Sequence, residues 1–210
     1  MSRSLLIVGA GGHGKVVGDA ALATGKWDTI AFVDDQISPN VSVIGLPVLG
    51  PTSTLHGLCG TFISIAVAIG TSSERIRMLE HCRSLGFELP IIVHPSAAVS
   101  PFATLKDGCV VCAQAVVSPG VRLEIGCIVN NSASVDHDCQ LGAGVHVCPG
   151  ARLAGSVHVG SGSWIGIGCC VRQGITIGSN VTVGAGAVVV GDVASGETVV
   201  GAPARPRRMR

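Results

Sequence analysis

The chain has 210 residues and a nearly even balance of charge, with 14 basic and 13 acidic side chains and a formal net charge of +1. With this balance nothing argues for nucleic acids or anionic membranes as partners, so we expect neither. The apolar run at 5–8 is too short for a signal sequence, and no stretch reaches the roughly 18 apolar residues of a transmembrane helix. We therefore expect a cytoplasmic protein that does not insert into membranes.

Residues 1–90 have the pattern of a small Rossmann-like α/β domain. Short apolar runs that suit buried strands alternate with stretches of helical periodicity, and turn residues separate them. The expected elements are, in chain order, a strand at 5–8, a helix at 15–23, a strand at 29–33, a strand at 62–69 and a helix at 73–85.

A glycine-rich turn joins the first strand to the first helix. Gly9, Gly11 and Gly14 form a G-x-G-x-x-G motif, and Asp34 and Asp35 follow about 20 residues later at the end of the second strand. Glycines let the backbone approach a pyrophosphate, and the positive end of the helix dipole favours its charge. The motif therefore predicts a site for a phosphorylated ligand.

Three interpretations of this turn are open. It could bind the nicotinamide cofactor of a dehydrogenase, but His13 would crowd a pyrophosphate there, and the chain offers no catalytic domain apart from the repeats described next. It could hold a nucleotide-linked substrate by the same backbone contacts, which is the interpretation that we favour. It could also be a tight turn without a ligand.

The second part of the chain repeats every six residues without interruption. A helix cannot keep a period of six on one face, whereas short strands separated by tight turns can. One position in each hexad is a branched aliphatic residue, and the residue two positions before it is small or apolar. Each hexad therefore points one large and one small side chain the same way. The repeated branched aliphatic residues are Val93, Val99, Leu105, Val111, Val117, Leu123, Val129, Val135, Leu141, Val147, Leu153, Val159, Ile165, Val171, Ile177, Val183 and Val189.

Hexapeptide periodicity is the signature of a parallel β-helix. Three hexads make a triangular coil of 18 residues, and coils stack at the strand spacing of roughly 4.8 Å. Stacking creates the core, because one coil alone buries almost nothing. The sequence thus predicts two domains: a Rossmann-like β-α-β domain at 1–90 and an all-β parallel β-helix with a C-terminal cap at 91–210.

Nine cysteines raise the question of metal or redox chemistry. Cys109 and Cys112 form a C-x-x-C motif, but the hexad places the Cys109 side chain inside the β-helix and the Cys112 side chain on its outer surface. Cys127, Cys139 and Cys169 also fall on small inward positions. We expect small core residues in a reducing compartment and no metal site.

The sequence Asp136-His137-Asp138 interrupts the apolar repeat near a coil corner. A histidine beside a carboxylate can accept a proton near neutral pH, because its unperturbed pKa is about 6.5. The alternative is a surface histidine with incidental acidic neighbours. His146 and His158 also point outward, and the histidine spacing does not match a three-histidine zinc site.

The C-terminus carries four arginines, which could meet phosphates or form a solvated tail. They are Arg205, Arg207, Arg208 and Arg210.

The hexads, the segment at 135–138 and the Val-Gly-Ala-Pro-Ala segment at 200–204 resemble the left-handed β-helix acyltransferases. With the glycine turn and Asp34-Asp35, the chain is similar to nucleotide-sugar acetyltransferases such as the bacillosamine and perosamine N-acetyltransferases, and to sialic acid O-acetyltransferases. The resemblance implies a left-handed solenoid, acetyl-CoA as co-substrate, and a homotrimer with active sites between subunits.

The resemblance also implies roles for individual residues. His137 would be the general base, supported by the acid that follows it, which is often Glu in the family and is Asp138 here. His146 would contact acetyl-CoA, and Gly155 would offer its N–H to the thioester oxygen. Ile167 and Ala185, within the Gly184–Gly186 stretch, would line the pantetheine arm. The substrate-binding residues would be Gly11, Gly12 and His13 for the diphosphate and sugar, and Asp34, Asp35 and Gly70 for the nucleoside.

The expected activity is direct acetyl transfer from acetyl-CoA to the amino group of a nucleotide-linked amino-deoxy sugar, of the 4-amino-4,6-dideoxyhexose type. Two alternatives stay open: a sugar O-acetyltransferase of the sialic acid type, and a nucleotide-binding scaffold without catalytic activity.

Overall fold

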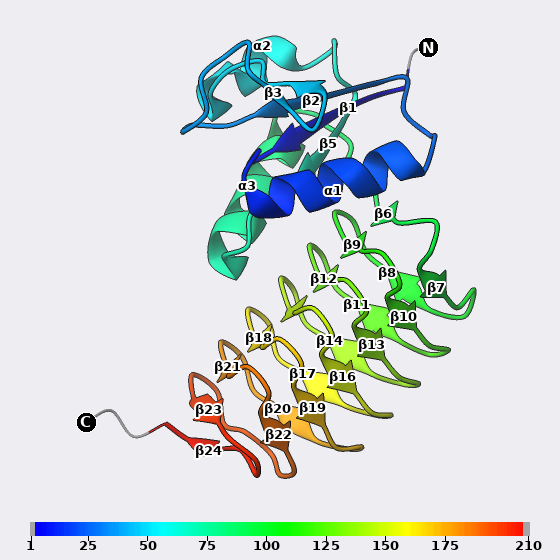
Figure 1. The fold of residues 1–210 in the computed structure, drawn as a ribbon, viewed down its shortest axis with the longest axis vertical. Helices are drawn as coiled ribbons and strands as arrows, with labels where there is room; N and C mark the ends of the chain where they lie inside the picture. Colours follow the sequence, from blue (N-terminus) through cyan, green and yellow to red (C-terminus); the bar gives the residue numbers. More distant parts are fainter. Residues whose placement is uncertain (1–2, 208–210) are drawn as a thin grey trace.

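A computed structural model describes residues 3–207, with a small α/β unit seated on one end of a β-solenoid (Figure 1). The α/β unit has a parallel three-stranded sheet in the order β2-β1-β5. Its elements are β1 (Ser4–Val8), α1 (Gly12–Ala23), β2 (Thr29–Val33), β3 (Ser42–Val43), β4 (Leu46–Pro47), a 3-10 turn (Thr52–Thr54), α2 (Leu55–Leu58), β5 (Ser64–Val67) and α3 (Ser72–Ser84).

The predicted elements of this unit are confirmed, with shifted ends. Helix α1 begins at Gly12 rather than residue 15, because the last glycines of the motif already belong to its first turn. Strand β5 is shorter than expected, and α3 begins and ends one residue earlier than expected.

The hexad prediction is confirmed in full: each of the seventeen repeats forms one two-residue strand that ends on its branched aliphatic residue. The strands are β6 (Ile92–Val93), β7 (Ala98–Val99), β8 (Thr104–Leu105), β9 (Val110–Val111), β10 (Val116–Val117), β11 (Arg122–Leu123), β12 (Ile128–Val129), β13 (Ser134–Val135), β14 (Gln140–Leu141), β15 (His146–Val147), β16 (Arg152–Leu153), β17 (His158–Val159), β18 (Trp164–Ile165), β19 (Cys170–Val171), β20 (Thr176–Ile177), β21 (Thr182–Val183) and β22 (Val188–Val189).

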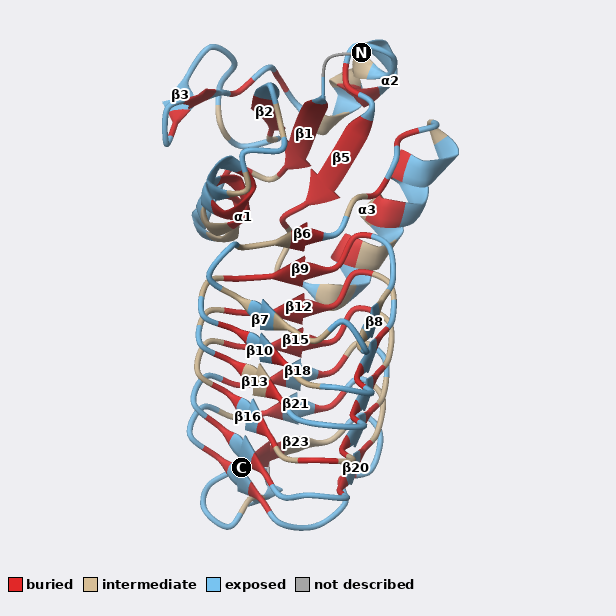
Figure 2. Ribbon diagram, turned by 90° about the vertical axis from the view of Figure 1, so that its right-hand side faces the viewer, coloured by how far each residue is buried: buried red, intermediate tan, exposed pale blue. Residues whose placement is uncertain are grey.

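These strands stack into three parallel sheets, which form the three faces of a prism (Figure 2). We name each face after its first strand. The β6 face holds β6, β9, β12, β15, β18, β21 and the two terminal strands; the β7 face holds β7, β10, β13, β16, β19 and β22; the β8 face holds β8, β11, β14, β17 and β20.

Partner residues in neighbouring coils are 18 positions apart, as in the pair Val117 and Val135. The aliphatic positions and the small inward positions, including Cys109, Cys127, Cys139 and Cys169, form one continuous buried core. The inward direction predicted for these four cysteines is therefore confirmed.

Three corners connect the faces. The His137 corner joins the β7 face to the β8 face, the Gly144 corner joins the β8 face to the β6 face, and the Ile167 corner joins the β6 face to the β7 face. Each name covers the whole column of stacked turns along that edge of the prism.

The N-terminal unit covers the upper part of the β6 face. Outward side chains of the first three coils on this face are apolar and buried against α1 and the sheet: Ile92, Val110 and Ile128. Cys112 lies outside the prism as predicted, but this contact buries it completely. Helix α3 packs against the Gly144 corner (Figure 2).

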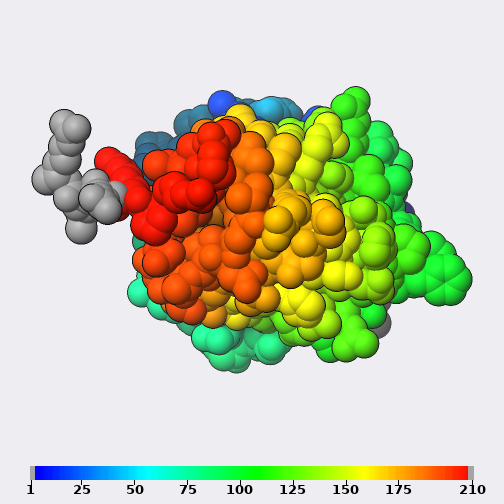
Figure 3. All heavy atoms as spheres, turned by 90° about the horizontal axis from the view of Figure 1, so that it is seen from below, coloured from blue at the N-terminus to red at the C-terminus, as the bar shows by residue number. Residues whose placement is uncertain are grey.

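The last strands, β23 (Thr198–Val200) and β24 (Arg205–Pro206), close the opposite end of the solenoid (Figure 3). Val193 and Val199 complete the core there. Arg205 and Arg207 are exposed, whereas Arg208 and Arg210 lie outside the described residues. No helix within residues 3–207 has the length and apolar character needed to cross a membrane.

Candidate active site

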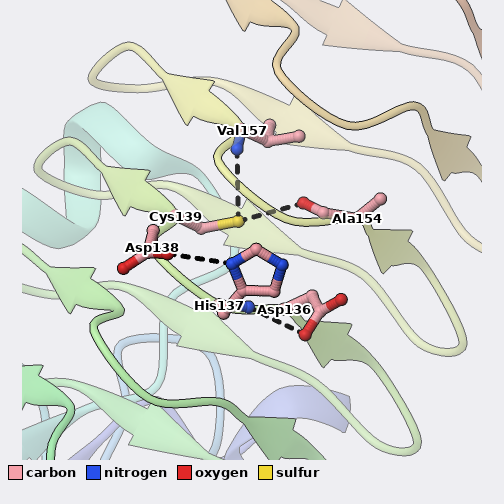
Figure 4. Close-up of polar contacts among 6 residues, drawn as sticks. All are labelled: Asp136, His137, Asp138, Cys139, Ala154 and Val157. Carbon is pink, nitrogen blue, oxygen red and sulfur yellow. Dashed lines mark hydrogen bonds and ion pairs between the residues drawn. The ribbon is translucent and has the colours of Figure 1, made fainter.

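His137 lies in the turn between β13 and β14, and its imidazole stands at the edge of the prism (Figure 4). Its Nδ1 is 2.9 Å from Oδ2 of Asp138, and its backbone N–H donates to Oδ1 of Asp136 at 2.8 Å. Asp138 adopts a left-handed conformation with φ 59°, and its own N–H donates to Pro119 of the coil above at 3.1 Å. The turn thus places Asp138, although its side chain is shorter than that of Glu, within hydrogen-bond distance of the His137 ring.

The contacts of His137 suit a proton acceptor. Because Nδ1 donates to Asp138 in the neutral ring, Nε2 keeps its lone pair. The hydrogen bond with Asp138 and the negative charge of Asp136 raise the pKa of His137 above its usual value. The side chain is 59% exposed, so a second molecule can reach it.

Gly155 lies one coil below His137 and shapes the space beside the ring. A Cβ at position 155 would overlap the imidazole and lie 2.5 Å from Cε1. The carbonyl of His137 accepts a bond from Ser156 at 2.8 Å, which fixes the spacing of the two coils. No acceptor within residues 3–207 takes the Gly155 N–H, so this donor is available beside the ring.

Cys139 is close to His137 in sequence, but its side chain is buried in the solenoid core, where Figure 4 shows its contacts with Ala154 and Val157. Its thiol donates to the Ala154 carbonyl at 3.2 Å inside the core, and burial raises its pKa to about 11. A thiol with this pKa is not ionised near neutral pH and is a poor nucleophile. No group of three metal-ligating side chains occurs in the described part of the chain.

The glycine turn forms a second site at the carboxyl ends of the sheet strands. A Cβ at Gly14 would overlap the Gly9 carbonyl, and Gly9 has φ +94°, so the turn requires glycine at both positions. Helix α1 has Gly11 as its N-cap, without a side-chain cap or an acid in its first turn. Its first N–H groups therefore remain available to an anion.

A cavity of about 470 Å³ opens beside this turn, lined in part by Gly11, Asp34, Asp35 and Ile69. Asp34 accepts bonds from the backbone N–H groups of Ala10, Gln36 and Ile37. Burial pushes the pKa of Asp34 upward, but these three bonds outweigh it and the net pKa is lowered.

Asp35 accepts bonds from the N–H and hydroxyl of Thr52. The structure therefore brings together three of the predicted substrate residues, Gly11, Asp34 and Asp35. Gly12 is exposed, and Gly70 lines a different cavity, of about 950 Å³, between α3 and the solenoid.

His13 and His146 meet at the contact between the N-terminal unit and the solenoid. Their rings are 5.9 Å apart, and His146 also packs on Trp164 at 4.4 Å. Nε2 of His146 accepts a bond from the Asn130 amide at 3.0 Å, so Nδ1 carries the proton and has no partner within residues 3–207. Sequence analysis placed His146 on the outside of the prism, and the N-terminal unit covers it there, leaving it 4% exposed.

Both of these histidines are held neutral. Burial, followed by the charge of Arg75, lowers the pKa of His146 to about 3 and that of His13 to about 4. His146 is therefore a weak proton acceptor near neutral pH, and its Nε2 lone pair is already bonded to Asn130.

Within one chain, the predicted site residues fall into separate places. His137, Asp138 and Gly155 lie along the His137 corner, while Ile167 and Ala185 lie exposed along the Ile167 corner. These corners form the two edges of the β7 face, so one chain does not bring the two groups together.

Arg75 was missed in the sequence analysis, although a signal for it exists. It lies in α3, where it is 0% exposed and forms a buried stripe with Leu79 and Cys82. The spacing of four and then three residues marks the buried face of a helix, and an arginine on that stripe signals a special contact.

The fold and the site together define a class: a hexapeptide solenoid with an exposed imidazole–carboxylate pair and a glycine-turn domain on its end. Family comparison identifies residues 4–82 as a PglD N-terminal domain and residues 156–191 as bacterial transferase hexapeptide repeats. A comparison with curated proteins finds no match.

Solved structures align with the chain over nearly its full length. The acetyltransferase domain of PglB from Neisseria gonorrhoeae FA1090, in complex with acetyl coenzyme A, is 48% identical with TM-score 0.95, covering 99% of this chain and 100% of that chain. A variant of perosamine N-acetyltransferase from Caulobacter crescentus, in complex with CoA and GDP-perosamine, is 37% identical with TM-score 0.94, covering 98% and 97%. WeeI from Acinetobacter baumannii AYE is 26% identical with TM-score 0.88, covering 98% and 100%.

The chain belongs to the hexapeptide-repeat acetyltransferase family, in the group that carries a PglD-type N-terminal domain. Its solenoid is the left-handed parallel β-helix of that family.

Proposed function

We propose that this protein transfers the acetyl group of acetyl-CoA to the amino group of a nucleotide-linked amino-deoxy sugar, of the 4-amino-4,6-dideoxyhexose type. The observation that carries the proposal is the exposed His137–Asp138 pair, 2.9 Å apart and seated over Gly155. The similarity to an acetyltransferase domain bound to acetyl coenzyme A and to an enzyme bound to GDP-perosamine supports the donor and the acceptor class.

The proposed reaction is direct transfer. The sugar nitrogen bonds to the acetyl carbon while Nε2 of His137 takes the proton that the nitrogen releases. Asp138 holds the ring and stabilises its charged form. The tetrahedral intermediate then expels the CoA sulfur, which receives this proton from the imidazolium of His137 and leaves as a thiol. General-base help of this kind is worth about 10²–10⁴-fold.

The Gly155 N–H is the proposed donor to the oxygen that becomes negative in the intermediate. A single donor of this type contributes on the order of 10²-fold. No acyl-enzyme is required, and the buried, protonated Cys139 is not suited to form one.

The proposed donor site includes residues on both edges of the β7 face. Ile167 and Ala185 would line the pantetheine arm on the Ile167 corner. His146 would contact acetyl-CoA. Because the N-terminal unit covers His146, this contact requires the acetyl end of the donor to enter the space beside His13. Gly11, Gly12 and His13 would hold the diphosphate and sugar, and Asp34, Asp35 and Gly70 the nucleoside.

A homotrimer would complete this site. The β7 face and its two corners expose apolar side chains that water disfavours: Phe102 is 77% exposed, Ile167 56% and Val116 40%. If three chains turn their β7 faces toward a common axis, the His137 corner of one chain meets the Ile167 corner of the next. We propose this arrangement, with active sites between subunits.

The experiment is to incubate the purified protein with acetyl-CoA and UDP-, GDP- or dTDP-linked amino sugars, together with matched hydroxy sugars. We expect thiol release and an amide product with at least one amino sugar. An ester product that hydroxylamine cleaves would instead establish a sugar O-acetyltransferase. Absence of thiol release with every nucleotide sugar would favour the scaffold interpretation and contradict the proposal.

A further inference from the structure

Arg75 is a fully buried cation that no carboxylate neutralises. It is 0% exposed, and none of the ion pairs within residues 3–207 includes it. A buried charge is costly unless hydrogen bonds compensate it. Arg75 satisfies this condition through backbone carbonyls rather than through an acid.

The guanidinium joins two parts of the molecule. On the N-terminal side, Nη1 donates to the carbonyls of Ile69 and Gly70, both at 2.7 Å. On the solenoid side, Nε donates to Gly126 at 2.8 Å and Nη2 donates to Gly144 at 2.6 Å. These four carbonyls take no backbone hydrogen bond from elsewhere in residues 3–207.

The two loop carbonyls belong to the segment between β5 and α3. Ile69 lines the cavity that also holds Gly11, Asp34 and Asp35. Gly70 lines the larger cavity between α3 and the solenoid. Arg75 therefore holds the wall of the proposed nucleotide pocket.

The two solenoid carbonyls belong to successive coils of the Gly144 corner, 18 residues apart. Both residues have a left-handed backbone, with φ +66° at Gly126 and +68° at Gly144. The rigid, planar guanidinium of Arg75 bonds two coils at once, so it fixes the position of α3 along the solenoid axis and its orientation. The flexible ammonium of a lysine cannot do this.

We propose that Arg75 is a positioning residue that sets the nucleotide-sugar pocket at a fixed place on the solenoid coils. The inference rests on the proposed function, because it concerns delivery of the acceptor to His137. The role of Arg75 is the same whether the acceptor reaches His137 of its own chain or of a neighbouring chain, because the pocket and His137 are both positioned by the solenoid.

The test compares Arg75→Met and Arg75→Lys with Arg83→Met. Arg83 is a matched control, because it also lies on α3 and also links it to the solenoid, through an exposed ion pair with Asp107 at 2.8 Å. We measure kcat with a nucleotide amino sugar, and the Kd of the free nucleoside diphosphate and of acetyl-CoA by calorimetry.

A misplacement of about 1 Å can reduce a rate by about 10²-fold. We therefore expect kcat to fall about 10- to 100-fold in Arg75→Met and less in Arg75→Lys, with both Kd values within about threefold of the wild type. Arg83→Met should stay within about twofold, because exposed ion pairs contribute little. An unchanged kcat in Arg75→Lys and Arg75→Met would contradict the proposal, as would loss of both ligands together, which would indicate a folding role.

Amide hydrogen exchange separates this proposal from the proposed function. In Arg75→Lys we expect faster exchange at 75–77, in the first turn of α3, and at 144–146, and unchanged exchange in the distant coils around β19. If the wild type transfers no acetyl group to any nucleotide sugar, the proposed function fails while this measurement still tests Arg75. Wild-type protection at both segments in the variant would overturn the proposal.

Discussion

Two histidines nine residues apart differ in almost every property that matters for catalysis. His137 stands exposed on a corner between two acids, and its pKa is raised. His146 projects from a neighbouring face of the same solenoid, but the N-terminal unit buries it and lowers its pKa to about 3. The repeat places both side chains outside the prism, so what covers each position decides its protonation.

The largest expected effect comes from removing the exposed imidazole. His137→Ala should reduce kcat by about 10²–10⁴-fold, because the proposed general base is lost. Acetyl-CoA affinity, measured by calorimetry, should change little. His158→Ala removes an exposed histidine from the β8 face and should leave kcat unchanged. Near-normal turnover of His137→Ala would show that this corner is not the catalytic one.

A smaller loss is expected when the ring is displaced rather than removed. In Gly155→Ala the new methyl group overlaps the imidazole, while the backbone N–H stays in place. We expect kcat to fall on the order of 10²-fold, as for a 1 Å misplacement. Gly191→Ala adds a methyl group where no atom lies within 4 Å and serves as the control. Equal rates in the two variants would contradict the placement of His137 above Gly155.

The buried histidine should affect stability rather than proton transfer. Because the pKa of His146 is about 3 in the folded state and about 6.5 in the unfolded chain, the unfolded state binds more protons below pH 6.5. Its contribution to stability is thus lost as the pH falls from 6.5 toward 3, amounting to about 2 kcal/mol at pH 5.

His146→Phe keeps an aromatic ring against Trp164 but cannot take up a proton. Urea unfolding at pH 7.5 and pH 5 should therefore show a smaller loss of stability for this variant than for the wild type. His158→Phe, at an exposed position, should show the wild-type loss. If the pH dependence of His146→Phe equals that of the wild type, His146 is not buried in the neutral form.

The smallest expected effect is a shift of the pH profile. The hydrogen bond with Asp138 raises the pKa of His137 above 6.5. A proposed base must be neutral to act, so activity should rise with pH through this raised pKa. Asp138→Asn should move this limb of kcat/KM to lower pH and keep the plateau within about tenfold of the wild type. A limb that does not move would mean that another group is titrating.

Much of this architecture could be read from local patterns. Each hexad carries its own aliphatic residue, so the strands follow from periodicity, and so does the inward direction of Cys139. The His137–Asp138 contact joins adjacent residues, which made it accessible to sequence analysis. The start of α1 was harder to place, because glycines at positions 12 and 14 lower helix propensity, although the turn continues directly into the helix.

The solenoid follows from the order of residues alone, since a six-residue period specifies which side chains point inward whatever surrounds the coil. The β-α-β unit and the imidazole beside an acid follow from it too. Which outward positions are covered depends on the docking of the N-terminal unit, because nothing in the repeat distinguishes a face that meets water from a face that meets another domain. The burial of His146 and the four carbonyls gathered by Arg75 depend on that docking, which joins residues far apart in the chain.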